Sequence, residues 1–288
     1  MKRIGLPMLV ALLLCPLIPG CAAAPDDPPR NPDAPPIAGP GAGPESPALG
    51  LVNLWRVVGA EGEDADTWLR LDAQEFQLWR DCGMINGSWE ASEGLFVGAV
   101  WGSSGECATG SRPTVPWLEA VTGYAATADG YQFVDAKGTV LATLTIDGAP
   151  EPIPTAAESF AQPPEITAKV KEVFRSPSPL AAGLEPATAD TLLGRWVPVA
   201  YAVKTDPHVR FAADGSWKGS DGCNGGEGRW TVGAGGVFLA TTGPSTLIAC
   251  AGAPVPTWVG QAASAGFDQG WLLLFDLDGN EMARLQRG

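Results

Sequence analysis

The sequence has a single histidine, His208, and it lacks the common signatures of an active site. A general base needs an oriented partner and a nucleophile, and the turn Asp206-Pro207-His208 specifies neither. No serine lies in the GxSxG pattern of hydrolases, and the glycine-rich stretches lack the lysine of a phosphate-binding loop. We therefore interpret His208 as an exposed loop residue, and we expect no catalytic residue, no cofactor and no enzymatic activity.

Metal-binding patterns are also missing. The six cysteines include no CxxC pair, which gives little support to a redox-active or metal-binding cysteine. The stretch from Asp276 to Asn280 begins like a calcium-binding loop, but its glycine comes at the fourth position and Arg287 stands at the twelfth. We expect a hairpin turn there, and no metal site.

Positive charge is scarce, with 18 Lys and Arg against 32 Asp and Glu and a formal net charge of −14. Binding of phosphate groups needs clustered cations, so this composition argues against a nucleic-acid partner. The excess of acidic residues is typical of a soluble surface that resists aggregation.

The one long apolar run lies at the N-terminus, from Ile4 to Ile18, and prolines interrupt it. It is shorter than the roughly 20 residues of a membrane-spanning helix. Two basic residues precede the run, and small or turn-forming residues follow it, which is the layout of a secretory signal. The ending Leu17-Ile18-Pro19-Gly20-Cys21 resembles a bacterial lipobox, whose cysteine carries lipid in the mature protein.

We therefore expect residues 1–20 to be a cleaved lipoprotein signal and Cys21 to be lipidated, with a plain signal peptide or a retained anchor as alternatives. Residues 21–50 are rich in Pro, Ala and Gly, which predicts a disordered tether. The protein is then expected at the cell membrane, held by its lipid and facing the extracytoplasmic side.

The rest of the chain is an internal repeat, found by sliding the sequence against itself by 141 positions. Tryptophan and cysteine are rare, and four pairs of them coincide at this offset: Trp55 with Trp196, Cys82 with Cys223, Trp89 with Trp230, and Trp117 with Trp258. We predict two copies of one module, at 51–147 and 191–287, joined by a linker at 148–190. Within the linker, residues 164–174 fit a short amphipathic helix that packs on a module through four residues: Ile166, Val170, Val173 and Phe174.

Four cysteines remain once Cys15 leaves with the signal and Cys21 takes lipid, and they allow three disulfide pairings. Pairing within each copy is favoured, because the copies then form equivalent closed units. The predicted disulfides are Cys82 with Cys107 and Cys223 with Cys250. Each is worth about 3.5 kcal/mol in the chain-entropy model.

Short apolar runs separated by Asp-Gly and Gly-rich turns indicate antiparallel strands in both copies. One helix interrupts the strands in each copy. Its apolar residues at helical spacing are Val255, Trp258, Val259 and Ala262 in the second copy, and Trp117, Val121 and Tyr124 in the first. The predicted fold is mainly β, with one short helix per module closing a small antiparallel sheet or partly open barrel.

The second copy carries an ordered set of motif residues: Leu193-Gly194-Arg195-Trp196, then Gly222-Cys223-Asn224, Trp230, and Thr246 four residues before Cys250. In these it resembles the META domain, the module of the HslJ-like heat-inducible lipoproteins of bacteria. The first copy departs from the pattern, since Gly83 follows its cysteine and Ser103 replaces the threonine. The resemblance implies tandem cracked-barrel domains in an envelope protein linked to heat shock or another stress, without established catalytic residues.

Two functional hypotheses follow. The first is a membrane-anchored interaction module that binds an envelope protein or a cell-wall component through loops near the disulfides. The second is a carrier or sensor that holds a small apolar ligand between sheet and helix, with tryptophans lining the cavity. A filled core favours the first hypothesis, and an open cavity in each module favours the second.

Overall fold

A computed structural model describes residues 46–107, 113–151, 157–200, 205–246, 248–249 and 251–288. The predicted signal peptide, the predicted lipidation site Cys21 and the predicted disulfide partner Cys250 lie outside these residues. The described residues all belong to one compact unit. Among the described residues, no helix is long and apolar enough to cross a membrane.

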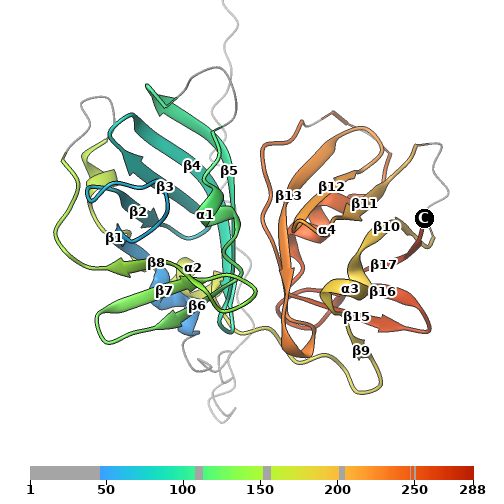
Figure 1. Ribbon diagram of the computed structural model, residues 1–288. Coiled ribbons are helices and arrows are strands. Elements are labelled where there is room, and N and C mark those ends of the chain that lie inside the picture. The colour runs from blue at the N-terminus through green and yellow to red at the C-terminus, as the bar shows by residue number, and fades with distance from the viewer. Residues whose placement is uncertain (1–45, 108–112, 152–156, 201–204, 247, 250) are drawn as a thin grey trace, which may run out of the picture. The chain divides into compact units, whose positions relative to one another are not determined.

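The first module is a closed barrel of eight antiparallel strands, in which each strand pairs with the next and β8 returns to β1 (Figure 1). A short helix, α1 (Pro116–Glu119), follows β5, and a 3-10 helix (Pro47–Leu51) precedes β1. The strands are β1 (Asn53–Val58), β2 (Trp68–Leu71), β3 (Glu75–Arg80), β4 (Gly83–Ser92), β5 (Leu95–Gly105), β6 (Gly123–Ala126), β7 (Gly130–Val134) and β8 (Val140–Thr145).

The second module is a nine-stranded sheet in the order β14-β13-β12-β11-β10-β17-β16-β15-β9. A single bridge between Val237 and Ser264 joins the β14 side to β15, so the sheet curls almost into a barrel. Its helices are α3 (Ala189–Leu192), α4 (Val255–Gln261) and a 3-10 turn at Ala234–Gly236. The strands are β9 (Glu185–Pro186), β10 (Gly194–Pro198), β11 (His208–Phe211), β12 (Ser216–Ser220), β13 (Gly225–Val232), β14 (Phe238–Ala240), β15 (Ser264–Asp268), β16 (Trp271–Phe275) and β17 (Glu281–Arg287).

The predicted mainly β fold with two antiparallel modules is therefore confirmed. Period-two alternation decides which side chains are internal: on β4, Trp89 and Ala91 belong to the barrel core, whereas Glu90 and Ser92 are excluded from it. Large aromatic residues fill both cores. The fully buried ones include Trp89, Phe96 and Phe133 in the first module and Trp196, Trp217, Phe211 and Phe238 in the second.

The repeat is visible in individual hydrogen bonds at the predicted offset. Trp55 Nε1 donates to the Leu51 carbonyl (2.8 Å), and Trp196 Nε1 donates to the Leu192 carbonyl (2.7 Å). In the β7–β8 turn, Asp135 Oδ1 accepts from the backbone of Lys137 and Thr139. In the β16–β17 turn, Asp276 Oδ1 accepts from Asp278 and Asn280 in the same way. The two modules thus share their local turn chemistry.

The predicted helices need three corrections. In the first module, α1 ends after one turn, and Tyr124 lies on strand β6 because Gly123 begins backbone pairing with Val134. In the linker, α2 (Ala168–Val173) starts later than expected, since Thr167 caps it, and Ile166 stays exposed before it. The second module has two helices instead of one.

Two predicted boundaries also shift. The end of the tether, at Pro47–Leu51, forms a 3-10 helix whose apolar side chains join the first core. The end of the linker supplies β9, which pairs with β15. Between these, the linker contains a 3-10 helix at Glu158–Ala161 and α2. Phe174, which follows α2 directly, packs on Trp89 with ring centroids 5.1 Å apart. The predicted packing of the linker helix on a module is therefore correct.

Candidate binding sites

The turn between β12 and β13, residues 220–225, is closed by the side chain of Asp221. Its Oδ1 accepts hydrogen bonds from the backbone of Cys223 (2.7 Å) and Asn224 (2.6 Å). Burial acts to raise the pKa of Asp221, but the hydrogen bonds from Asn224 and Cys223 outweigh it and lower that pKa. The carboxylate is thus ionised at neutral pH and fixes the turn.

Asn224 connects this turn to the segment after β14. Its Nδ2 donates to Asp221 Oδ2 (2.9 Å) and to the Ile248 carbonyl (2.8 Å). Its Oδ1 accepts from Thr246 Oγ1 (2.8 Å) and from the Ile248 backbone (2.7 Å). An asparagine amide can make four such bonds, and here all four are made by a residue that is 7% exposed. We call the turn 220–225 with Ser245, Thr246 and Ile248 the Asn224 node.

The predicted motif residues therefore separate into two groups. Asn224 and Thr246 meet in the Asn224 node, whereas Trp230 is a core residue. Its indole nitrogen donates to the Ser216 carbonyl (3.0 Å), and its ring packs edge-on against Phe211. Ile248, which sequence reasoning missed, presents its side chain to solvent with 61% exposure.

A disulfide joins Cys82 and Cys107 in the first module, which is the pairing expected from the sequence. Next to it, the β4–β5 ladder begins with Gly83 opposite Gly105. A Cβ atom on Gly83 would lie 2.4 Å from the Ser104 carbonyl oxygen, and its φ of +132° is unfavourable for other residues. In the second module, Cys223 is disulfide-bonded, and the expected partner Cys250 lies outside the described residues.

A buried carboxylate braces the first module. The side chain of Glu63 is 2% exposed and receives hydrogen bonds from Arg80 Nε (2.8 Å), Trp117 Nε1 (2.6 Å) and Thr67 Oγ1 (3.3 Å). These three donors hold α1 and β3 to the loop after β1. Because its charge is balanced by Arg80 and its oxygens are occupied, Glu63 serves as structural support.

A charged cavity of about 710 Å³ lies beside the disulfide of the first module. Arg56 and Arg80 line it together with several carboxylates, and Arg56 is already paired with Asp66 (3.1 Å) and Asp147 (3.0 Å). The buried indole nitrogen of Trp79 also lies at this cavity without a hydrogen-bond partner.

A smaller cavity, about 230 Å³, lies between the outer face of β4, the linker, and the β14 and α4 region. Glu90, Ser92 and Gln74 are its polar residues on the side of the first module. Gln74 Nε2 donates to Glu90 Oε1 (2.9 Å), and the buried Ser92 hydroxyl has no partner.

His208 is less exposed than expected, because it begins strand β11 and pairs with Ser220. Its Nδ1 lies 2.8 Å from the Asp206 carbonyl oxygen and 3.5 Å from the Asp206 carboxylate, which is itself paired with Arg195. These contacts hold the imidazole at the start of β11, an inner strand of the second sheet.

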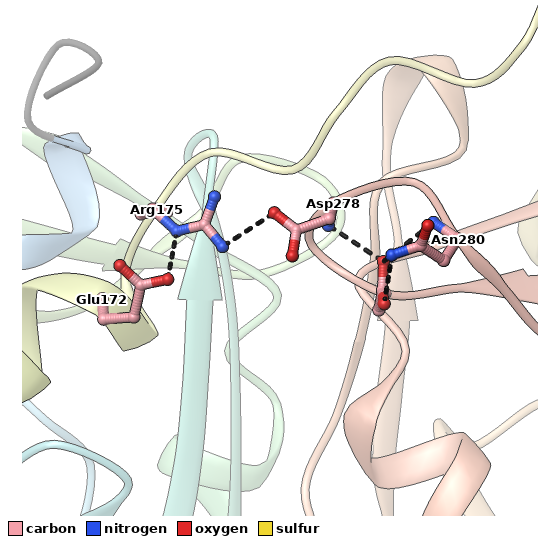
Figure 2. A network of polar contacts seen from close by, with 5 residues as sticks. Glu172, Arg175, Asp278 and Asn280 are labelled. Carbon is pink, nitrogen blue, oxygen red and sulfur yellow. Dashed lines mark hydrogen bonds and ion pairs between the residues drawn. The ribbon is translucent and has the colours of Figure 1, made fainter. Parts of the chain in front are cut away.

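The stretch from Asp276 to Asn280 is the β16–β17 hairpin turn, as expected from the sequence. Its first carboxylate, that of Asp276, accepts hydrogen bonds from the Asn280 side chain and from the turn backbone, and these lower the pKa of Asp276. Asp278 instead faces Arg175 of the linker, which also contacts Glu172 (Figure 2). The ion pairs of Arg175 measure 3.0 Å to Asp278 and 2.7 Å to Glu172. Among the residues with described positions, no group of three or more His, Cys, Asp or Glu is placed to hold a metal ion.

Comparison with known protein families matches residues 190–288 to the META domain. No curated protein and no solved structure matches the chain. The matched segment begins within α3 and contains every strand of the second sheet except β9. It also contains the motif residues Asn224, Trp230 and Thr246, which the structure places in the node and the core. The second module of this protein is a META domain.

Proposed function

We propose that the chain is a non-catalytic, lipid-anchored protein of the cell envelope, and that its META domain binds a partner protein through the Asn224 node. The META domain supports a stress-related protein of the lipoprotein type. The lipobox-like sequence before Cys21 supports the anchor, and the Pro-rich segment after it would hold the modules away from the membrane.

One observation carries the proposal: an exposed apolar side chain is held by a fully satisfied polar network. Asn224 makes two of its four side-chain hydrogen bonds to the backbone of Ile248, which fixes that residue while its side chain stays in solvent. Ser245 adds a bond from its hydroxyl to the Gly225 carbonyl (2.8 Å). An anchor residue that is rigid before binding loses less entropy when a partner covers it.

The chemistry of the Asn224 node also indicates what kind of protein surface would bind it. Interfaces gain most of their affinity from a few anchors seated in apolar pockets, surrounded by a polar rim. Here the anchor would be Ile248, and the ionised Asp221 supplies negative charge beside it. The matching surface is a protein with an apolar pocket bordered by Lys or Arg, which an acidic chain would also attract at long range.

The packing of both cores favours this function over a carrier. Six tryptophans are buried in the two hydrophobic cores: Trp55, Trp89, Trp117, Trp196, Trp217 and Trp230. None of these six tryptophans lines the cavity at the disulfide or the cavity at the linker. A ligand held inside either sheet would have to displace close-packed aromatic rings.

Site-specific photo-crosslinking in the native host tests the docking surface. A photoreactive amino acid at position 248 should give a discrete crosslinked protein, and the same probe at Val140 should not. Val140 is a suitable control because it is also an exposed aliphatic residue, on β8 of the other module. Adding Asn224→Ala to the position-248 probe should weaken the product. Equal products from both positions, or none from position 248, would contradict the proposal.

Anchoring is tested separately by fractionation. Cys21→Ala should move the protein from the membrane to the soluble extracytoplasmic fraction and abolish incorporation of labelled fatty acid. Cys15→Ala is the control, because that cysteine is expected to leave with the signal. Membrane retention of the Cys21→Ala protein would show that another segment holds it.

A further inference from the structure

The cavity at the linker has a polar floor and apolar walls. Glu90 and Ser92 stand two positions apart on β4 and therefore share its outer face, opposite to the core residues Trp89 and Ala91. The other walls come from the linker and from the β14 and α4 region. They include Val173, Phe238, Leu239 and Leu277.

Three acceptor atoms are available at the floor. The Ser92 side chain is buried, with the residue 7% exposed, and its hydroxyl has no hydrogen-bond partner. Gln74 uses its amide nitrogen on Glu90 Oε1, so its carbonyl oxygen and Glu90 Oε2 remain to accept. A buried hydroxyl without a partner is unfavourable, which makes this floor a place where a donor group would be stabilised.

Glu90, the acidic residue of the floor, has no ion pair with a cation among the described residues. Burial raises the pKa of Glu90 to about 7, although the hydrogen bond from Gln74 acts to lower it. Among the described residues that line the cavity, Arg175 is the one cation, and it is already paired with Glu172 and Asp278. A positively charged ligand group would therefore gain an ion pair that the protein leaves unmade.

We propose that this cavity binds a small primary alkylammonium ion. The ammonium group has three donors, which match Glu90 Oε2, the Ser92 hydroxyl and the Gln74 carbonyl oxygen. Its alkyl chain lies against Leu239 and Val173, and a volume of about 230 Å³ limits it to a short chain. This site uses none of the residues of the Asn224 node, so it is independent of the docking function.

Calorimetric titration of the purified full-length protein in detergent tests the site, with n-butylammonium as the probe. We expect binding at a ratio of one to one. The neutral n-butanol, the donor-free tetramethylammonium and the anionic butyrate should each bind at least about 10-fold more weakly, because each lacks either the charge or the three donors. Equal binding of butanol would show an apolar cavity without the proposed head-group site.

Two variants locate the binding. Glu90→Gln keeps the shape and removes the charge, and it should weaken butylammonium binding by about 10-fold or more. Ser92→Ala should weaken it by a smaller factor. Glu75→Gln, on the exposed start of the neighbouring strand β3, makes the same charge change outside the cavity and should have no effect. A Glu90→Gln variant that binds butylammonium with the affinity of the wild-type protein would overturn the proposal. A wild-type protein that does not bind butylammonium would also overturn it.

The pH dependence gives a second readout. The ammonium group pairs with the ionised form of Glu90, so affinity for butylammonium should fall as the pH drops below about 7. Circular dichroism at each pH and for each variant separates lost binding from lost fold. An affinity that stays constant from pH 8 to pH 5.5 in the folded protein would exclude Glu90 as the ligand-binding group.

Discussion

The two modules tie the same two chain segments together with different chemistry. In the first module, the cysteine-containing turn before β4 contacts the end of β5. In the META domain, the cysteine-containing turn between β12 and β13 contacts the segment after β14. After the cysteine, the first module has Gly83, whose missing side chain lets β4 approach the Ser104 backbone. The META domain has Asn224 at that position, and its side chain forms the link. The same place in a repeat can therefore be stabilised by close backbone contact or by a side-chain network.

The difference extends to what each module exposes. In the first module, the buried carboxylate of Glu63 accepts hydrogen bonds from Arg80 and Trp117 and so joins internal segments. The META domain uses its polar network to present Ile248 to solvent. This contrast supports a division of roles, with the META domain as the docking module and the first module as its support.

The largest expected effect compares the equivalent tryptophans Trp89 and Trp230. Trp89→Ala removes a ring that packs against Phe96 and Phe174, and we expect a loss of about 4–5 kcal/mol of unfolding free energy. Trp230→Ala should cost less, about 3 kcal/mol, because that ring is slightly more exposed and packs mainly on Phe211. Urea unfolding followed by circular dichroism measures both.

Trp271→Ala is the control for this pair, since that ring is partly exposed and lies over Arg284 at 5.0 Å. It should cost less than about 1 kcal/mol. Equal losses at all three positions would show that the aromatic cores do not dominate the stability of the modules.

The next effect concerns the disulfides. Cys82→Ala opens a loop with a sequence separation of 25, and it should cost about 3.5 kcal/mol at equilibrium. Alkylation of the folded, unreduced protein should label none of the four cysteines at positions 82, 107, 223 and 250. Labelling of one pair would show which module lacks its predicted bridge.

Two substitutions, one in each module, test how the residue after the cysteine stabilises its turn. Gly83→Ala should cost about 1–3 kcal/mol, because a Cβ atom would clash with the Ser104 carbonyl at a positive φ. Asn224→Ala should cost a similar amount by leaving the Ile248 backbone without its partners. The two differ in location: hydrogen exchange should rise at β4 and β5 for the first and around residue 248 for the second. Exchange that rises globally in either variant would contradict these local roles.

Sequence patterns predicted the repeat, most strands and the Cys82–Cys107 bridge because these depend on local periodicity and on rare residues at a fixed offset. They failed where contacts between distant parts of the chain determine the secondary structure of a residue or its side-chain partners. Tyr124 has helical spacing from Trp117, yet pairing with β7 places it on a strand. Asn224 and Thr246 were recognisable as motif residues, but their contact depends on how the chain returns after β14.

The linker cavity was beyond sequence reasoning for the same reason. The alternation along β4 marks Glu90 and Ser92 as outward-facing, which alone is typical of a solvated strand. Phe238 and Leu277, on the opposite wall, are far away in the chain and belong to the second module. The only local signal was a polar pair flanked by core residues, and such pairs are common on sheet surfaces.

The smallest expected effect is a pH dependence confined to the first module. Glu90 has a raised pKa of about 7 in the folded protein, so the folded state binds more protons than the unfolded state between about pH 4.5 and 7. Stability should therefore fall as the pH rises through this range, by about 1 kcal/mol after allowance for the partial exposure of Glu90. The equivalent position in the META domain is Thr231, which does not titrate. Glu90→Gln should thus remove this part of the dependence, and Glu75→Gln should keep it, in thermal unfolding measured from pH 5 to 8. A dependence that persists in Glu90→Gln would assign it to another group and separate the pH response from the linker cavity.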